Sequence, residues 1–261
     1  MPVLATMKHG DYTGLAGDYA RFRPGYAPQV ATAILGYVRR AAADLDAADI
    51  GAGTGIWTCQ LAGRGLRSVV AVEPNDEMRG QGIETSRGMN ITWRKGCAEA
   101  TGLPDASFDL VTMASSLHWA DFEPACAEFQ RILRPGGVFA ALWNPRCIEA
   151  NPLLLEIEAQ ISRLKPCLQR VSSGRSGITE RLTDLLGAQP KFCEVLYLEG
   201  RHSQHQTPEQ YLGAWRSVND VQVQLGPELF KMFLDFVERR IAGLKVIETV
   251  YLTRAWVVRR I

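Results

Sequence analysis

The chain has 261 residues, of which 46% are hydrophobic and 22% charged, and its formal net charge is +1. This length and balance are typical of one large globular domain, or of one domain with a smaller addition. The near-zero charge argues against DNA or long RNA as a partner, because proteins follow a phosphate backbone with a strongly basic surface.

Cysteine spacing and hydropathy exclude further classes of protein. The six cysteines lie at least twenty residues apart, so they form neither a CxxC pair nor a zinc-like cluster. We therefore expect reduced thiols, no metal site and a cytoplasmic location. The first residues lack the regions of a signal peptide, and no apolar run is long enough to span a bilayer, so we expect no membrane partner.

Helix-like and strand-like segments alternate through the first half of the chain. Strands covered on both faces are typically short apolar runs, and helices show apolar residues at helical spacing. The predicted strands are 47–50, 68–74, 91–98, 108–116 and 138–144, and the predicted helices are 28–43, 55–65, 75–87 and 123–137. This alternation with short loops predicts parallel strands between two layers of helices.

The second half changes in character after Asn144. Four helices are predicted, at 152–166, 177–188, 207–218 and 226–244, with a glycine- and serine-rich break at 172–177. The alternating run 192–206 predicts a less buried strand, and 246–261 a final β-rich segment. We expect these segments to add to the sheet domain rather than to form an independent one.

The segment DIGAGTGIW, 49–57, joins a predicted strand to a predicted helix. A phosphate-binding P-loop needs Lys and Ser or Thr after its last glycine, but Ile56 and Trp57 stand there, so a triphosphate is excluded. A dinucleotide fingerprint needs its third glycine at position 56. S-adenosylmethionine is the nucleoside-type ligand that remains; a tight turn without a ligand is the structural alternative.

Two further strand ends carry features that suit an adenosyl group. Glu73 lies eighteen residues beyond Gly55, and a carboxylate there can accept both ribose hydroxyls. The loop after the third strand should lie beside the base, where the backbone of Cys97 and Ala98 or the Glu99 side chain can bond its edge. Features at three successive strand ends favour a ligand over a turn alone.

The motifs DIGAGTG, VEPNDEM, CAEATGLPDASFDLV and RILRPGG are similar to those of class I S-adenosylmethionine-dependent methyltransferases. With YARFRPGY before the sheet and SSLHW after the fourth strand, residues 11–144 resemble the small-molecule, type 11-like group. That group includes trans-aconitate and antibiotic-pathway methyltransferases. The resemblance implies an α/β fold: a doubly wound Rossmann-like sheet of seven strands with one antiparallel strand at its edge.

The resemblance also implies an organisation for the chain. A single methyltransferase domain over 1–261 would comprise N-terminal lid helices at 11–43, a cofactor-binding core at 44–144, and substrate-cap helices with the final strands at 145–261. We expect a monomer or homodimer.

Roles for individual residues follow from the matching motifs. Asp49, Gly51 and Gly53 would face the methionine part, Glu73 would take the ribose, and Ser115 would lie under the sulfonium. The commoner acidic residue near the base is displaced here to Glu99, so the adenine contact departs from the family pattern. The implied S-adenosylmethionine-binding residues are Tyr19, Arg23, Asp49, Gly51, Ala52, Gly53, Glu73, Pro74, Met78, Cys97, Ala98, Glu99 and Ser115.

Acceptor chemistry leaves fewer traces, because in-line methyl transfer mainly needs alignment and exclusion of water. His118 is the candidate catalytic base, since imidazole titrates near neutral pH; orienting a loop is its alternative role. Tyr12, Trp143 and Trp215 are candidates for binding the substrate, although tryptophans are more often core residues. His202 and His205 are expected as an exposed loop pair rather than metal ligands.

The same motifs have three rival interpretations. A nicotinamide oxidoreductase conflicts with the displaced glycine, and an amino-methylating DNA enzyme conflicts with ASSLHW after the fourth strand. A protein that binds S-adenosylmethionine but steers a cyclisation, or no longer transfers methyl groups, would carry the same motifs. We expect methyl transfer to a small molecule, in secondary metabolism.

Overall fold

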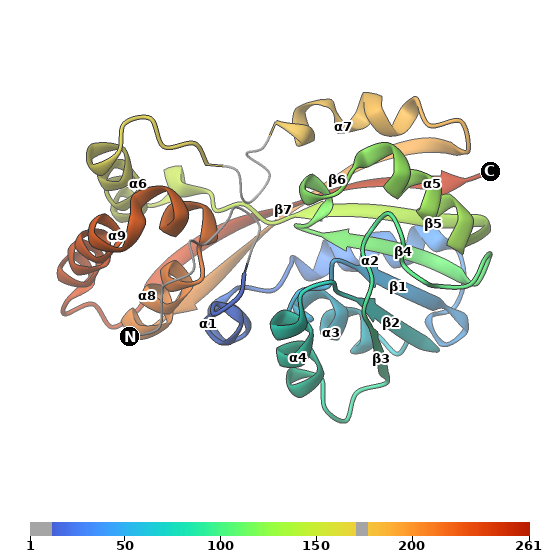
Figure 1. The fold of residues 1–261 in the computed structure, drawn as a ribbon, viewed down its shortest axis with the longest axis horizontal. Helices are drawn as coiled ribbons and strands as arrows, with labels where there is room; N and C mark the ends of the chain where they lie inside the picture. Colours follow the sequence, from blue (N-terminus) through green and yellow to red (C-terminus); the bar gives the residue numbers. More distant parts are fainter. Residues whose placement is uncertain (1–11, 171–176) are drawn as a thin grey trace.

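The computed structural model describes residues 12–170 and 177–261. Within these ranges the strands form one seven-stranded sheet in the order β3-β2-β1-β4-β5-β7-β6. The strands are β1 (Asp46–Ile50), β2 (Ser68–Val72), β3 (Ile91–Arg94), β4 (Phe108–Ala114), β5 (Leu133–Trp143), β6 (Phe192–Gln206) and β7 (Ile247–Arg260). The predicted doubly wound α/β sheet is confirmed (Figure 1).

Helices follow most strands, as the alternating pattern predicted. The α-helices are α1 (Ala16–Phe22), α2 (Pro28–Val38), α3 (Ile56–Ala62), α4 (Asp76–Thr85), α5 (Phe122–Ile132), α6 (Pro152–Leu164), α7 (Ile178–Gly187), α8 (Pro208–Arg216) and α9 (Asn219–Ile241). Short 3-10 turns are η1 (Ala42–Asp44), η2 (Leu117–Trp119) and η3 (Ile148–Ala150). Most of the break predicted at 172–177, and residue 11 of the predicted lid, lie outside the described residues.

Two apolar cores lie on opposite faces of the sheet. Helices α5 and α7 cover one face through residues such as Phe129 and Leu182. Helices α2 and α3 cover the other face through residues such as Ile34 and Leu61. Because both faces are covered, the central strands are nearly uniform in burial, as the apolar run of β4 predicted (Figure 1).

The antiparallel strand lies one place in from the sheet edge, which corrects the sequence expectation. β7 pairs antiparallel with β5 on one side and with β6 on the other, so β6 is the outermost strand. Strands β6 and β7 pair as a long antiparallel ribbon, and helices α8 and α9 lie between them in sequence. The outer part of this ribbon, 200–206 with 247–253, extends beyond the pairing of β7 with β5 and leads into the cap helices.

A third core holds the cap together at the end of this antiparallel ribbon. Helices α6, α8 and α9 pack around Trp215 and Phe233 (Figure 1). Helix α9 is kinked at Gly226, whose φ of 72° is not helical, and Pro227 follows. The helix predicted from residue 226 therefore corresponds only to the part of α9 after the kink.

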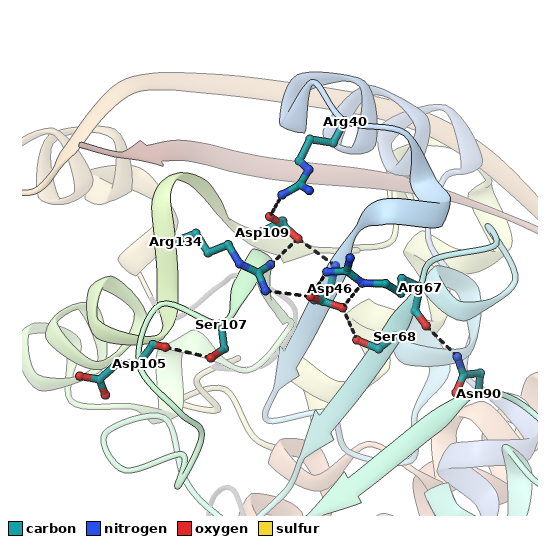
Figure 2. Close-up of polar contacts among 9 residues, drawn as sticks. All are labelled: Arg40, Asp46, Arg67, Ser68, Asn90, Asp105, Ser107, Asp109 and Arg134. Carbon is teal, nitrogen blue, oxygen red and sulfur yellow. Dashed lines mark hydrogen bonds and ion pairs between the residues drawn. The ribbon is translucent and has the colours of Figure 1, made fainter.

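At the amino ends of the strands, charged side chains form a cluster (Figure 2). Asp46 accepts hydrogen bonds from Arg67 and Arg134, and Asp109 accepts them from Arg40 and Arg134. Arg134 lies in RPGG, at the end of the predicted helix 123–137. It belongs to β5 instead, because Leu133 already pairs with Phe108 in β4.

Candidate functional site

A cavity of about 210 Å³ opens at the carboxyl ends of β1, β2, β3 and β4, next to the residues around α1. It collects residues that the sequence assigned to the cofactor from five separate segments. Those among its lining residues are Tyr19, Gly51, Ala52, Gly53, Glu73, Pro74, Met78, Cys97, Ala98, Glu99 and Ser115. Tyr12, assigned to the substrate, also lines it.

The turn after β1 can be built only with glycine at its key positions. Gly51, Gly53 and Gly55 all have positive φ, between 58° and 82°. A Cβ on Gly51 would lie 2.7 Å from the Ser116 Oγ. The hydroxyl of Thr54, which lines the cavity, is buried without a hydrogen-bond partner among the described residues. A close backbone turn with an unused buried hydroxyl suits a polar ligand.

Glu73 follows β2 and is only 7% exposed. Its Oε2 accepts a hydrogen bond from the Gly53 N–H at 2.8 Å, and its Oε1 accepts one from the Asn75 N–H at 2.9 Å. Burial raises the pKa of this carboxyl, while the two N–H groups oppose that rise. The carboxylate is therefore held between the glycine turn and α4, in the wall of the cavity.

The end of the cavity that the sequence assigned to adenine is formed by apolar and small residues. Met78 and Ala98 are buried and line the cavity. Glu99 also lines it, but its Oε1 accepts a hydrogen bond from the Asp121 N–H at 2.7 Å. The Glu99 side chain thus ties the loop after β3 to the start of α5.

Asp49 does not line the cavity. In β1 its side chain points toward α3, where Oδ2 accepts a hydrogen bond from the Thr58 hydroxyl at 2.6 Å. Oδ1 accepts one from Thr112 at 3.0 Å. Burial raises the pKa of Asp49 to about 7, although both hydroxyls act against the rise. Asp49 supports the glycine turn from behind, which corrects its expected position facing the methionine part.

A second, smaller cavity of about 60 Å³ shares Tyr12, Tyr19, Tyr26 and Ser115 with the first. Arg23 lines this second cavity rather than the first. The shared residues place the two cavities against a common wall at the end of β4.

Arg23 connects the lid to the cap. Its Nε donates to the Ser217 Oγ at 2.7 Å and its Nη2 to the Ser217 carbonyl at 2.9 Å. Its guanidinium also lies 5.0 Å from the ring centre of Tyr19. The sequence expectation that Arg23 meets the cofactor carboxylate stays a prediction.

His118 lies in η2 and lines the second cavity. Its Nδ1 accepts a hydrogen bond from the indole N–H of Trp143 at 3.3 Å. Burial lowers the pKa of His118 to about 4, so the ring is neutral at neutral pH. A neutral imidazole with an accepting Nδ1 carries its proton on Nε2. This geometry favours a hydrogen-bond donor at Nε2 over the catalytic base predicted from the sequence.

Trp143 and Trp215 are both 0% exposed, and neither lines either cavity. Trp143 packs edge-on against Trp256, and Trp215 against Phe233. Their predicted place in the substrate wall is therefore corrected, since both are core residues. Each instead supports a residue that does line the second cavity: Trp143 bonds His118, and Trp215 lies under Arg146.

His202 and His205 belong to β6 and not to a loop. The Nε2 of His202 lies 3.1 Å from the Asn144 Oδ1, and its ring stacks on Tyr251. Within residues 12–170 and 177–261, no group of three or more His, Cys, Asp or Glu side chains is arranged to hold a metal ion. The same ranges contain no helix able to cross a membrane.

Tyr26, Arg146 and Tyr251 are among the cavity residues that the sequence did not indicate. Tyr26 lines both cavities, and its hydroxyl donates to the Ser115 Oγ at 3.0 Å. Ser115 itself has a φ of 56°, uncommon for a residue with a side chain. Arg146 and Tyr251 line the second cavity and form an isolated β-bridge. The RPGY motif could have indicated Tyr26, but the other two meet only through the fold.

Comparisons with known proteins agree with this geometry. Residues 48–141 match the methyltransferase domain family. A Mycobacterium tuberculosis protein named as an uncharacterized methyltransferase is 39% identical over 132 residues, covering 50% of each chain. A Dictyostelium discoideum protein named as a methyltransferase is 33% identical over 137 residues, covering 52% of this chain and 50% of its own. The matches thus span about half the length of these curated relatives.

Solved structures show the same fold over most of the chain. A protein from Anaeromyxobacter dehalogenans described as a type II methyltransferase aligns with a TM-score of 0.64 and 24% identity, covering 91% of this chain and 98% of its own. A methyltransferase from an antibiotic biosynthesis pathway of Anabaena variabilis aligns with a TM-score of 0.60 and 22% identity, covering 90% and 98%. By its matched domain, its relatives over about half of the chain and its fold, the chain is similar to methyltransferases.

Proposed function

We propose that S-adenosylmethionine binds in the first cavity and that its methyl group passes to a small-molecule acceptor in the second. The observation that carries this proposal is the shared wall. Ser115 and Tyr26 line both cavities, so a methyl donor in one would lie beside an acceptor in the other. The small volume of the second cavity, about 60 Å³, favours a small acceptor over nucleic acid.

The residues of this chain fit the cofactor. The Glu73 carboxylate is placed to accept the ribose hydroxyls, and Met78 and Ala98 offer apolar contacts to a base. The positive φ values of the glycine turn let backbone approach the ligand closely. When bound, S-adenosylmethionine supplies a strongly electrophilic methyl group.

The chain's own groups would align the reactants and exclude water. Tyr12 and Tyr19 pack edge to face beside the cavities, with ring centres 5.5 Å apart, and form part of the covering lid. Helix α1 packs on α8 through Phe22, which fills the space that a side chain at Gly213 would need. The segment around α1 is therefore held against the cap, beside both cavities.

The decisive experiment separates cofactor binding from transfer. Calorimetry of the purified protein should give saturable binding of S-adenosylmethionine and of S-adenosylhomocysteine, and none of NADH. Incubation with methyl-labelled cofactor and a broad panel of small acceptors, followed by mass spectrometry, should then yield a labelled product. Tight NADH binding without cofactor binding would refute the proposal. Cofactor binding with no labelled product across the panel would instead favour a non-transferring or cyclisation-steering protein.

The biological setting stays part of this proposal. We infer a cytoplasmic protein acting in secondary metabolism, as a monomer or homodimer. All six cysteines are free thiols, which supports a reducing compartment.

A further inference from the structure

We propose that the second cavity binds an anionic group of the methyl acceptor through the guanidinium of Arg146 and the Nε2–H of His118. The acceptor role rests on the proposed function, but anion binding can be tested without methyl transfer. The shared chemistry is that of a small oxyanion, a carboxylate or a phosphate.

The first argument is the charge of the lining. Both charged residues of the lining are arginines, Arg23 and Arg146, and the described residues contribute no carboxylate to it. The Arg23 hydrogen bonds go to a neutral partner, Ser217. Because a desolvated cation needs a counter-charge, this lining favours a negatively charged ligand.

The ion pairs next to the cavity do not cancel the positive charge of its lining. Arg146 lies 3.5 Å from Glu158, and Arg170 binds both Glu158 and Asp220, at 2.6 and 3.1 Å. Two carboxylates thus serve these two arginines. With Arg23 included, these three arginines and two carboxylates carry one more positive charge than negative charge.

Arg146 is held in one position before any ligand arrives. Its backbone is fixed by the β-bridge to Tyr251, and its guanidinium lies 4.0 Å from the centre of the Trp215 ring. Stacking on the ring leaves the N–H groups at the edge of the guanidinium to bind a planar anion. The Nη2 of Arg146 approaches Glu158 to 3.5 Å, which is a long ion pair.

His118 supplies the second donor. The indole of Trp143 occupies its Nδ1, so the neutral ring presents N–H at Nε2. That nitrogen is buried and has no partner among the described residues. A buried donor of this kind is satisfied when an oxyanion accepts its hydrogen bond. Trp143 is a positioning residue in this account, because it acts only through His118.

The test uses the wild-type chain saturated with S-adenosylhomocysteine and titrated by calorimetry in a low-chloride buffer. The probes are phenylacetate, phenyl phosphate and the neutral phenylacetamide. We expect saturable binding of at least one anion and none of the amide; the better anion identifies the carboxylate or phosphate class. Equal binding of amide and anion, or no binding of either anion, would overturn the proposal.

Variants identify the residues responsible. Arg146→Gln should weaken anion binding by about tenfold or more, since it removes a charge-assisted bond. Arg240→Gln is the matched control: this arginine belongs to the same cap but pairs with Glu156 on the surface. It should leave anion binding unchanged. Equal anion affinity in wild type and Arg146→Gln would contradict the assignment.

His118 needs a pair of variants. His118→Gln keeps an N–H near the Nε2 position, whereas His118→Leu removes it. Anion binding should stay within about threefold in the first and fall by about tenfold in the second. Equal anion binding in both variants and in wild type would remove His118 from the site. If wild type fails to bind S-adenosylhomocysteine, the proposed function fails, and the same titrations on the free protein still decide the anion site.

Discussion

At the amino ends of β1 and β4, Asp46 and Asp109 bind arginines (Figure 2). At the carboxyl ends of β1 and β2, by contrast, Asp49 and Glu73 bind hydroxyl and backbone N–H groups. Hydrogen bonding from Arg67 holds the pKa of Asp46 below its usual range, despite partial burial. Burial raises the pKa of Asp49 to about 7. The same residue type therefore meets opposite electrostatic conditions at the two ends of one strand.

The difference separates scaffold from site. Carboxylates at the amino edge have their charge compensated within the chain, so they have little left to offer a ligand. At the carboxyl edge, neutral donors hold the carboxylates and leave their charge uncompensated, which costs stability but leaves Glu73 able to bind hydroxyl groups. Functional sites commonly carry such perturbed groups.

The largest effect is expected from Glu73→Gln. The amide loses the charge that strengthens the ribose hydrogen bonds, so the Kd for S-adenosylhomocysteine should rise about 100-fold by calorimetry. Glu84→Gln is a matched control, because Glu84 is exposed on α4 and pairs only with Arg87 among the described residues. An unchanged Kd in Glu73→Gln would refute the ribose assignment.

Asp109→Asn, at the amino edge, should lower the stability of the fold and leave cofactor binding almost unchanged. Arg40 and Arg134 lose a charged partner that is only 3% exposed. The free energy of unfolding in urea should fall by about 2 kcal/mol, less than for a fully buried pair because both arginines are partly exposed. The Kd for S-adenosylhomocysteine should change less than about twofold. A large loss of cofactor affinity would mean that the two edges are not independent.

The predictable part of the molecule is the part encoded locally. A strand, a glycine turn and a helix are adjacent in sequence, so the ligand-facing positions Gly51, Gly53 and Glu73 could be inferred from spacing. Parallel strands then bring their carboxyl ends to one edge. For this reason the residues of one cavity wall, 51–53, 73, 74, 78, 97–99 and 115, were predicted together.

The acceptor side could not be inferred in this way. Arg146 meets Tyr251 through a bridge between segments about one hundred residues apart, and no local pattern signals that contact. Trp143 and Trp215 were assigned to a wall because of residue type, yet hydrophobic burial placed them in cores. The position of β7 likewise depends on its antiparallel pairing with β6, which spacing alone does not reveal.

A pH series should distinguish the two edges by sign. The pKa of Asp49 is raised from 3.8 to about 7 in the folded state, so its charged form opposes folding. Relative to Asp49→Asn, wild type should lose about 1 to 2 kcal/mol of stability as pH rises from about 4 to 7. Asp46 has a lowered pKa, so it stabilises the fold above about pH 4 and loses that contribution in acid.

Urea unfolding of wild type, Asp49→Asn and Asp46→Asn from pH 3 to 8 measures both slopes. As the pH falls, the free energy of unfolding of wild type should rise relative to that of Asp49→Asn. Below about pH 4, the free energy of unfolding of Asp46→Asn should come close to that of wild type. Slopes of the same sign would contradict the contrast between the two ends of β1.

The smallest effect is expected from Arg67→Gln. Arg67 is 48% exposed, and Asp46 retains its bonds to Arg134 and Ser68 when Arg67 is replaced. The loss of unfolding free energy should be small and should vanish near 1 M salt, because solvent ions screen exposed pairs. Arg134→Gln is the comparison, since Arg134 bridges both aspartates and is less exposed. Equal losses of unfolding free energy in the two variants would mean that only the number of charges near Asp46 matters. A larger loss for Arg134→Gln that persists at high salt would show that Arg134, which both aspartates share, contributes most of the stability at the amino edge.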